Sequence, residues 1–331
     1  MKLASGPTSL GAAGLRTVGI DDVPIERSSL CRTDGSAISR HAASDGARSA
    51  VPKLVCILSV GRTGTNHLAK ILSNIPEIDS RRELFNPDRI WWMLPHELTE
   101  FSRRVGKALP CSPESQQTIT MVRRRPGLAL DCLVDMLAPE KRVLTFKVFV
   151  NQLTVRQVKK AIIRRPDTVI IFIRRRPIDT YVSHRKASRL RQWVRVDTTQ
   201  VKVSIDARGF LKWRRQTSAW YRGLEAACWS MDKRFYELTY ESDIAVSSIE
   251  AARRFCAILE DCGLGPFTLP GDDLDLGLTQ QDRTKDVRDR MANWPEFQRY
   301  LITKGSLDKA FEPIPHYQPT RWDRLRRRLL A

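Results

Sequence analysis

The chain has 331 residues, and its 56 Lys and Arg against 37 Asp and Glu give a formal net charge of +19. With 42% hydrophobic and 28% charged residues, its composition is that of a folded chain and excludes a disordered or fibrous protein. No run approaches the roughly 18 apolar residues of a membrane-spanning helix, and the charge points to polyanionic partners: nucleic acid, phosphates, sulfates or an acidic membrane surface.

The predicted folded part begins after residue 50. Residues 1–50 are rich in Ser, Gly, Ala, Arg and Asp without periodicity, so we expect a disordered N-terminal tail. Residues 54–59 (LVCILS) form an apolar run of strand length. A glycine-containing turn over 61–65 and apolar residues at positions 68, 71 and 72 follow, which predicts a strand, a turn and a helix.

Further strands and helices alternate along the rest of the chain. Strands are predicted over 143–150, 168–173 and 235–240. Helices are predicted over 154–163, from Pro177 onward, and over 210–231, 246–262 and 293–302. We expect a loop over 263–289. The pattern favours one three-layer α/β domain over residues 51–305, with a central parallel sheet flanked by helices, and a basic C-terminal tail over 306–331.

The turn after the first strand has the composition of an anion site. A turn that leads into a helix presents free backbone N–H groups and the positive end of the helix dipole. Gly61 and Gly64 allow close approach of a phosphate, and Arg62 adds a charged donor. Neutral donors come from Thr63, Thr65 and Asn66. The Walker A pattern is absent, and the alternative interpretation is an ordinary turn between strand and helix.

A second charged turn follows the strand at 168–173. Ser183 lies eight residues after Arg175, about two helical turns along, so its hydroxyl can face the same cleft as the guanidinium. An arginine fork and a hydroxyl suit a phosphate monoester. The alternative is a basic surface turn. Because both turns follow the carboxyl ends of buried strands, they favour one ligand cleft.

Together the two turns resemble the motifs of sulfotransferases that use 3′-phosphoadenosine 5′-phosphosulfate (PAPS), most closely the bacterial carbohydrate enzymes of the nodulation-factor and trehalose type. The similarity covers about residues 52–302 and implies a P-loop-like fold. It implies transfer of a sulfuryl group from PAPS, without a metal, to the hydroxyl of a carbohydrate or glycolipid. Residues 61–66 (Gly61, Arg62, Thr63, Gly64, Thr65 and Asn66) would hold the 5′-phosphosulfate, and Arg175 and Ser183 the 3′-phosphate.

Three further site residues follow from this resemblance. Glu83, in the segment 80–87, stands where the family places a catalytic glutamate, and a sugar hydroxyl needs a base within hydrogen-bond reach. A surface ion pair with Arg82 is the alternative, and His184 is the rival base. Lys147 would stabilise charge on the transferred group, and the alternative is a lysine in solvent at the end of a strand. Gln281 belongs to a segment, 279–294, that resembles the cofactor-closing loop, although Gln280 replaces the family's lysine and Asn66 its usual Ser or Thr.

Other features leave rival functions open. The strand–turn–helix would also suit a P-loop kinase or NTPase, and the charge a nucleic-acid-binding protein, although no nucleic-acid signature supports the latter. Residues 156–195 hold thirteen Lys and Arg against two Asp, which predicts a positive field over the cleft. Trp91 and Trp92 would stack on a sugar ring or belong to the core, and residues 123–125 would meet an anionic acceptor or only solvent.

Cysteine usage and the chain ends bear on location and partners. The seven cysteines are odd in number and lack a C-x-x-C pair, and the five histidines are scattered, which indicates reduced thiols and no zinc site. With no N-terminal anchor, we expect a cytoplasmic enzyme of bacterial type. The oligomeric state is open. A basic cluster in the tail leaves peripheral contact with a membrane, or nucleic acid, open for that segment: Arg321, Arg324, Arg326, Arg327 and Arg328.

Overall fold

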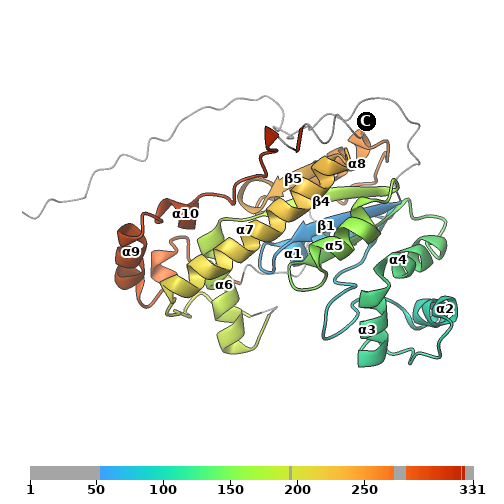
Figure 1. The fold of residues 1–331 in the computed structure, drawn as a ribbon, viewed down its shortest axis with the longest axis horizontal. Coiled ribbons are helices and arrows are strands. Elements are labelled where there is room, and N and C mark those ends of the chain that lie inside the picture. Colours follow the sequence, from blue (N-terminus) through green and yellow to red (C-terminus); the bar gives the residue numbers. More distant parts are fainter. Residues whose placement is uncertain (1–52, 194–195, 272–280, 322, 325–331) are drawn as a thin grey trace, which may run out of the picture. The chain divides into compact units, whose positions relative to one another are not determined.

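The computed structural model describes residues 53–193, 196–271, 281–321 and 323–324, and these contain a parallel sheet flanked by helices (Figure 1). The predicted N-terminal tail over 1–50 lies outside the described residues. The strand order is β2-β3-β1-β4-β5, and every neighbouring pair is parallel. The strands are β1 (Leu54–Ser59), β2 (Ile78–Ser80), β3 (Val143–Phe149), β4 (Thr168–Arg174) and β5 (Phe235–Thr239).

The helices follow the strands in an α/β alternation. They are α1 (Thr65–Leu72), α2 (Pro95–Val105), α3 (Gln116–Arg124), α4 (Pro126–Asp135), α5 (Val155–Val158), α6 (Pro177–Leu190), α7 (Ala207–Ser230), α8 (Ser248–Asp261), α9 (Trp294–Thr303) and α10 (Asp308–Phe311). Two π-helical turns cover Lys159–Ile163 and Tyr240–Ile244, and a 3-10 turn covers Arg288–Arg290. The four longer strands and the predicted helices are confirmed to within a few residues, except that α5 continues as a π turn.

Alternating residues of β1 show why both faces of the sheet are covered. Leu54, Cys56 and Leu58 belong to one buried cluster together with residues of α4, α5 and α7. Val55 and Ile57 belong to another together with residues of α1 and α8. An uninterrupted apolar run is what a strand buried on both faces requires. The predicted three-layer α/β fold is therefore confirmed, and Figure 1 shows α7 crossing one face of the sheet.

A third buried cluster joins the C-terminal helices to α6. Ile178 of α6 and Phe210 of α7 pack with Phe297 of α9 and Ala310 of α10. The ring of Phe210 lies 5.6 Å from that of Phe297, centroid to centroid. This packing fixes the helix that carries Ser183.

The chain order places two loops side by side. β1 lies between β3 and β4, so the chain leaves β1 toward one side of the sheet and later returns on the other. Such a switch point opens a crevice at the carboxyl ends of the strands. The loops that follow β1 and β4 meet there, and both carry predicted ligand residues.

Candidate functional site

The turn after β1 is held in shape by buried hydroxyl groups. The hydroxyls of Ser59 and Thr63 are 2.6 Å apart and share a hydrogen bond. Ser59 Oγ donates to the carbonyl of Ile173 in β4 (2.9 Å), and Thr63 Oγ1 lies 2.9 Å from the carbonyl of Val60. Thr63 was predicted to hold the 5′-phosphosulfate, but its hydroxyl is used to shape the turn. The group that Thr63 has left for a ligand is its backbone N–H.

Gly64 is required by the backbone and by a close neighbour. Its φ is +81°, and a Cβ placed there would lie 2.5 Å from Cδ2 of Tyr240. Arg62 also has a positive φ (+75°), so two residues of the turn are left-handed. Backbone N–H groups in such a turn can converge on an anion. Beside Gly61 a Cβ would meet nothing within 4 Å, and Thr65 begins α1 as a buried residue.

We expect Gly64→Ala to lower the free energy of unfolding by about 2–4 kcal/mol, because a left-handed alanine is strained and its Cβ displaces the Tyr240 ring. Urea unfolding followed by circular dichroism measures the change. Gly61→Ala is the matched control, since the space beside Gly61 is open, and we expect a change below about 1 kcal/mol there. Equal losses in the two variants would contradict this view of the turn.

The two predicted phosphate turns meet directly. Arg62 Nε donates to Ser183 Oγ on α6 (3.1 Å), and the same guanidinium donates to Gln281 Oε1 and to the carbonyl of Trp193. Arg175 Nη1 donates to the backbone carbonyl of Arg62 (2.8 Å). Four residues predicted from three segments of the chain, Arg62, Arg175, Ser183 and Gln281, thus form one hydrogen-bonded cluster.

The guanidinium of Arg175 packs on an aromatic ring and has one N–H group without a hydrogen-bond partner in the described structure. Its guanidinium carbon lies 4.0 Å from the ring centroid of Tyr240, the same ring that packs against Gly64. Its Nε is buried and has no hydrogen-bond partner among the described residues. Burial, together with the charge of Arg175, lowers the pKa of Arg62. Within the described ranges, neither guanidinium has a carboxylate within 4.0 Å, so the cluster carries unneutralised positive charge.

A second cluster joins Glu83 to the phosphate turn. The ammonium of Lys147, on β3, donates to Oδ1 of Asn66 in α1 and lies 3.8 Å from Glu83 Oε1. Glu83 Oε2 accepts from Asn86 Nδ2 (2.9 Å) and from Gln152 Nε2 (2.8 Å). One carboxylate oxygen is therefore held by two amides, while the other faces the lysine. The structure brings together three residues that the sequence analysis singled out separately: Glu83, Lys147 and Asn66.

The model of the sulfotransferase family matches residues 52–261. The chain belongs to the sulfotransferase family. No curated protein matches the chain. The chain is similar to the solved sulfotransferase domain of the curacin biosynthetic pathway (15% identity, 85% of this chain and 98% of that one, TM-score 0.41). It is also similar to a sulfotransferase from Alicyclobacillus acidocaldarius (16% identity, 78% and 95%, TM-score 0.38).

Burial of Lys147 predicts that the stability of this sulfotransferase depends on pH. Lys147 is 1% exposed, and burial lowers the pKa of its ammonium to about 8, although Glu83 acts in the opposite direction. The unfolded chain keeps that proton up to about pH 10.4. Between these values the unfolded state binds more protons than the folded state, so stability rises with pH in this window.

We therefore expect the free energy of unfolding of the wild type to rise between pH 8 and about 10.4 relative to Lys147→Met, which lacks the proton. Urea unfolding of both proteins across this range measures the difference. Lys53→Met is a control, because Lys53 is exposed. A difference between wild type and Lys147→Met that stays flat with pH would contradict the buried, protonatable lysine.

The side-chain amide of Gln152, which holds the carboxylate of Glu83, was not predicted from the sequence. Gln152 is 1% exposed, and its Oε1 accepts from the N–H of Phe149 (3.0 Å), so the side chain is fixed at both ends. Arg123 donates to the backbone carbonyl of Gln152 (3.0 and 3.1 Å), which gives this arginine a structural contact. A turn directly after β3 is a place where such a residue can reach the site, but only the three-dimensional pairing identifies it.

His184, the rival base, lies near Arg62 and Trp193. Its ring centroid is 5.3 Å from that of Trp193, and burial, with the charges of Arg185 and Arg62, lowers the pKa of its imidazole. The side chain of Lys147 donates a hydrogen bond to Asn66 and forms an ion pair with Glu83, and neither contact includes His184. The structure thus groups Glu83, and not His184, with the buried lysine.

Ion pairs fix the segment that carries Gln281. Lys186 on α6 donates to Asp282 Oδ2 (2.6 Å), and Arg290 pairs with Asp179 (2.9 Å). Asn293 exchanges two hydrogen bonds with the backbone of Ile205 (2.9 and 3.1 Å). Residues 279 and 280 of the predicted closing loop lie outside the described residues. The described part is tied to α6 and so holds Gln281 beside Arg62.

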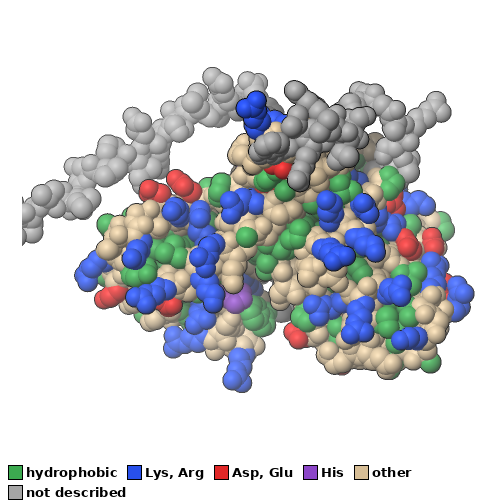
Figure 2. All heavy atoms as spheres, viewed as in Figure 1, with side chains coloured by type: hydrophobic (Ala, Val, Ile, Leu, Met, Phe, Trp, Pro, Cys, Tyr) green, Lys and Arg blue, Asp and Glu red, His purple; other side chains and the backbone are tan. Residues whose placement is uncertain are grey.

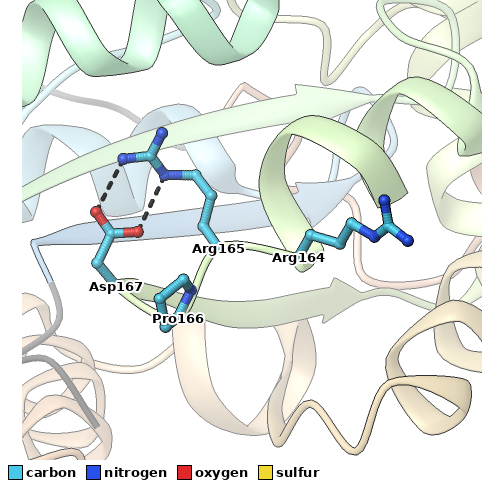
Figure 3. A pocket seen from close by; sticks show the side chains of 4 residues that line it. All are labelled: Arg164, Arg165, Pro166 and Asp167. Atoms are coloured by element: carbon cyan, nitrogen blue, oxygen red, sulfur yellow. Dashed lines mark hydrogen bonds and ion pairs between the residues drawn. The ribbon is translucent and has the colours of Figure 1, made fainter.

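Two other features lie apart from this site. Glu225, Glu237 and His316 have ligand atoms close enough for a metal, but both carboxylates pair with the buried guanidinium of Arg174. An open hollow of about 510 Å³ is lined by residues 164–167 (Figure 3), where Arg165 pairs with Asp167 (2.9 Å). It precedes β4, so it lies at the edge of the sheet opposite the site.

The surface of the sulfotransferase is strongly basic. Figure 2 shows Lys and Arg side chains spread over the visible face, with few Asp and Glu among them. Among the described residues, no helix has the length and apolar character needed to cross a bilayer. The cytoplasmic location expected from the sequence stays a prediction.

Proposed function

We propose that this sulfotransferase moves a sulfuryl group from PAPS to a hydroxyl of a carbohydrate or glycolipid. The observation that carries the donor assignment is the pair of half-buried guanidiniums, Arg62 and Arg175, which have no carboxylate partner among the described residues and lie at the carboxyl ends of β1 and β4. Charges withdrawn even partly from water are normally paired, so such a cluster fits an anionic ligand. The Nε of Arg175, which has no hydrogen-bond partner within the described part of the chain, supplies a free N–H for such a ligand.

The residues present fit a donor with two phosphorus centres. Arg175 and Ser183 would hold the 3′-phosphate, as the resemblance implies. Residues 61–66 would hold the 5′-phosphosulfate: Gly61, Arg62, Thr63, Gly64, Thr65 and Asn66. Arg62, which already donates to both Ser183 and Gln281, would form the bridge between the two halves. The donor, when bound, supplies an activated sulfuryl group.

Transfer then needs a base, charge stabilisation and alignment. The acceptor oxygen forms a bond to sulfur while the bond from sulfur to the phosphate oxygen breaks, and the hydroxyl proton passes to Glu83. Asn86 and Gln152 orient the carboxylate by holding Oε2. The ammonium of Lys147 stabilises charge on the transferred group, and Arg62 with the turn's N–H groups stabilises the leaving phosphate. Arg62, Arg175 and Lys147 supply the positive charge that other enzymes take from a metal.

Product analysis tests the proposal. We expect ³⁵S-labelled PAPS, incubated with a mixture of oligosaccharides and glycolipids, to give a labelled product and adenosine 3′,5′-bisphosphate in equal amounts. ATP labelled at the γ-phosphate, with Mg²⁺ and the same acceptors, should give no labelled product. Phosphoryl transfer without sulfuryl transfer would contradict the proposal and favour the kinase alternative.

A further inference from the structure

Large apolar side chains that are exposed gather around the proposed active site. Seven such side chains are at least about a third exposed among the described residues, and two of them, Leu269 and Ile302, lie elsewhere. The other five, called the apolar rim here, are Trp91 (38% exposed), Trp92 (49%), Leu94 (44%), Val150 (37%) and Trp193 (48%). Single exposed apolar residues are ordinary, but a concentration of them at one place marks a binding surface.

Hydrogen bonds and ring contacts tie two rim residues to the proposed base. The N–H of Trp91 donates to the carbonyl of Glu83 (3.3 Å). The guanidinium of Arg82 lies 5.2 Å from the ring centroid of Trp92, and the carbonyl of Arg82 accepts from the N–H of Lys147 (3.1 Å). Trp91 and Trp92 therefore stand on the same short segment that presents Glu83.

Other contacts tie two more rim residues to the lysine and to the donor side. Val150 follows Phe149, whose ring centroid lies 5.5 Å from Lys147 Nζ. The carbonyl of Trp193 accepts from Arg62. Apolar surface therefore flanks both Lys147, on the acceptor side, and Arg62, on the donor side, and the transferred sulfuryl group must pass between them.

The exposed ring of Trp92 is held out by a fixed backbone. Its φ is +70°, a conformation that costs a bulky residue about 1–2 kcal/mol and persists only when its surroundings impose it. Arg81 imposes it, because its guanidinium donates to the Trp92 carbonyl and pairs with Asp79 (2.7 Å) and Glu97 (2.8 Å). Glu97 is 2% exposed. A strained backbone fixed by a largely buried ion-pair network is a pre-organised surface.

We propose that the apolar rim binds the apolar part of an amphipathic acceptor whose polar head presents its hydroxyl to Glu83. This inference rests on the proposed function and narrows its acceptor from a carbohydrate or glycolipid to a sugar that carries an acyl or alkyl chain. A hydroxyl within reach of Glu83 places the remainder of the acceptor over Trp91 and Trp92. The guanidiniums over these rings, Arg89 at 4.8 Å from Trp91 and Arg82 over Trp92, suit the polar junction between head and chain.

A matched pair of ligands tests the rim. Octyl β-D-glucoside, below its micelle concentration, and methyl β-D-glucoside share one sugar and differ only in chain length. We expect octyl glucoside to bind at least about tenfold more tightly by calorimetry in the presence of adenosine 3′,5′-bisphosphate, since burial of two methylenes already accounts for that ratio. Trp92→Gly, which accepts the positive φ, should reduce the ratio at least about threefold, and Trp193→Ala should also reduce it.

Ile302→Ala is the control, because Ile302 is 58% exposed on α9, and we expect the ratio to stay unchanged. Equal affinity for the two glucosides, no binding of either, or a ratio that Trp92→Gly leaves intact would overturn the rim proposal. Binding of adenosine 3′,5′-bisphosphate, measured in the same titrations, reports on the proposed function separately. A wild type that binds the bisphosphate but does not distinguish the glucosides refutes the rim alone.

Discussion

Replacement of Arg175 by alanine is expected to weaken binding of adenosine 3′,5′-bisphosphate by about 100-fold or more. The guanidinium is the proposed ligand of the 3′-phosphate, and its buried Nε has no other partner in the described structure. It also donates to the carbonyl of Arg62 and packs on Tyr240, so its loss loosens the turn that would hold the 5′ end. Calorimetric titration of variant and wild type measures the effect.

Arg164→Ala is the matched control for this experiment. Arg164 is an exposed arginine at the opposite edge of the sheet, so its removal changes the net charge equally without touching the cluster. We expect its affinity to stay within about twofold of the wild type. If both variants lost affinity equally, the binding would reflect general positive charge and not a phosphate site.

Glu83→Gln is expected to lower turnover by about 10²–10⁴-fold while the affinity for adenosine 3′,5′-bisphosphate stays the same. Glutamine keeps the shape of the side chain but cannot take the acceptor proton. The carboxylate lies beside Lys147 and not within the Arg62 and Arg175 cluster, so donor binding does not depend on it. Initial rates of sulfuryl transfer, with calorimetry on the same preparation, separate the two effects.

Glu140→Gln controls for the loss of a carboxylate, because Glu140 is exposed in the loop before β3, and it should retain full turnover. A fully active Glu83→Gln variant would show that another group takes the proton. Combined loss of donor binding and turnover would instead assign Glu83 to the donor site.

The sheet and the donor turns were predictable because each depends on local sequence. β1 and β4 are buried on both faces, so their apolar runs are continuous and easy to detect. The turns that follow them carry glycine and arginine at fixed offsets. Once β1 and β4 are neighbours, the meeting of Arg62 with Ser183 follows from topology.

Other parts depend on pairings that local sequence does not contain. β2 has only three residues, and only its pairing with β3 defines it as a strand. Gln152 reaches Glu83 across 69 positions of sequence, and a glutamine after a strand has no pattern of its own. α5 changes into a π turn at Lys159, which helical periodicity does not reveal.

The basic stretch over 156–195 shows the same limit. The sequence predicted a positive field concentrated over the cleft. The chain instead runs from the carboxyl edge of the sheet along α5 to the amino edge, where Arg164 and Arg165 line the opposite hollow (Figure 3). The part from Arg174 through α6, with Arg185 and Lys186, returns to the site. Charge that is adjacent in sequence is therefore divided between two edges of the sheet.

Calorimetric titration with adenosine 3′,5′-bisphosphate tests the central claim most directly, because it needs neither an acceptor nor catalysis. The account predicts saturable binding to the wild-type protein without Mg²⁺, and much weaker binding of adenosine 5′-monophosphate, which lacks the 3′-phosphate proposed to contact Arg175 and Ser183. Absence of binding, or a preference for ATP with Mg²⁺, would contradict it.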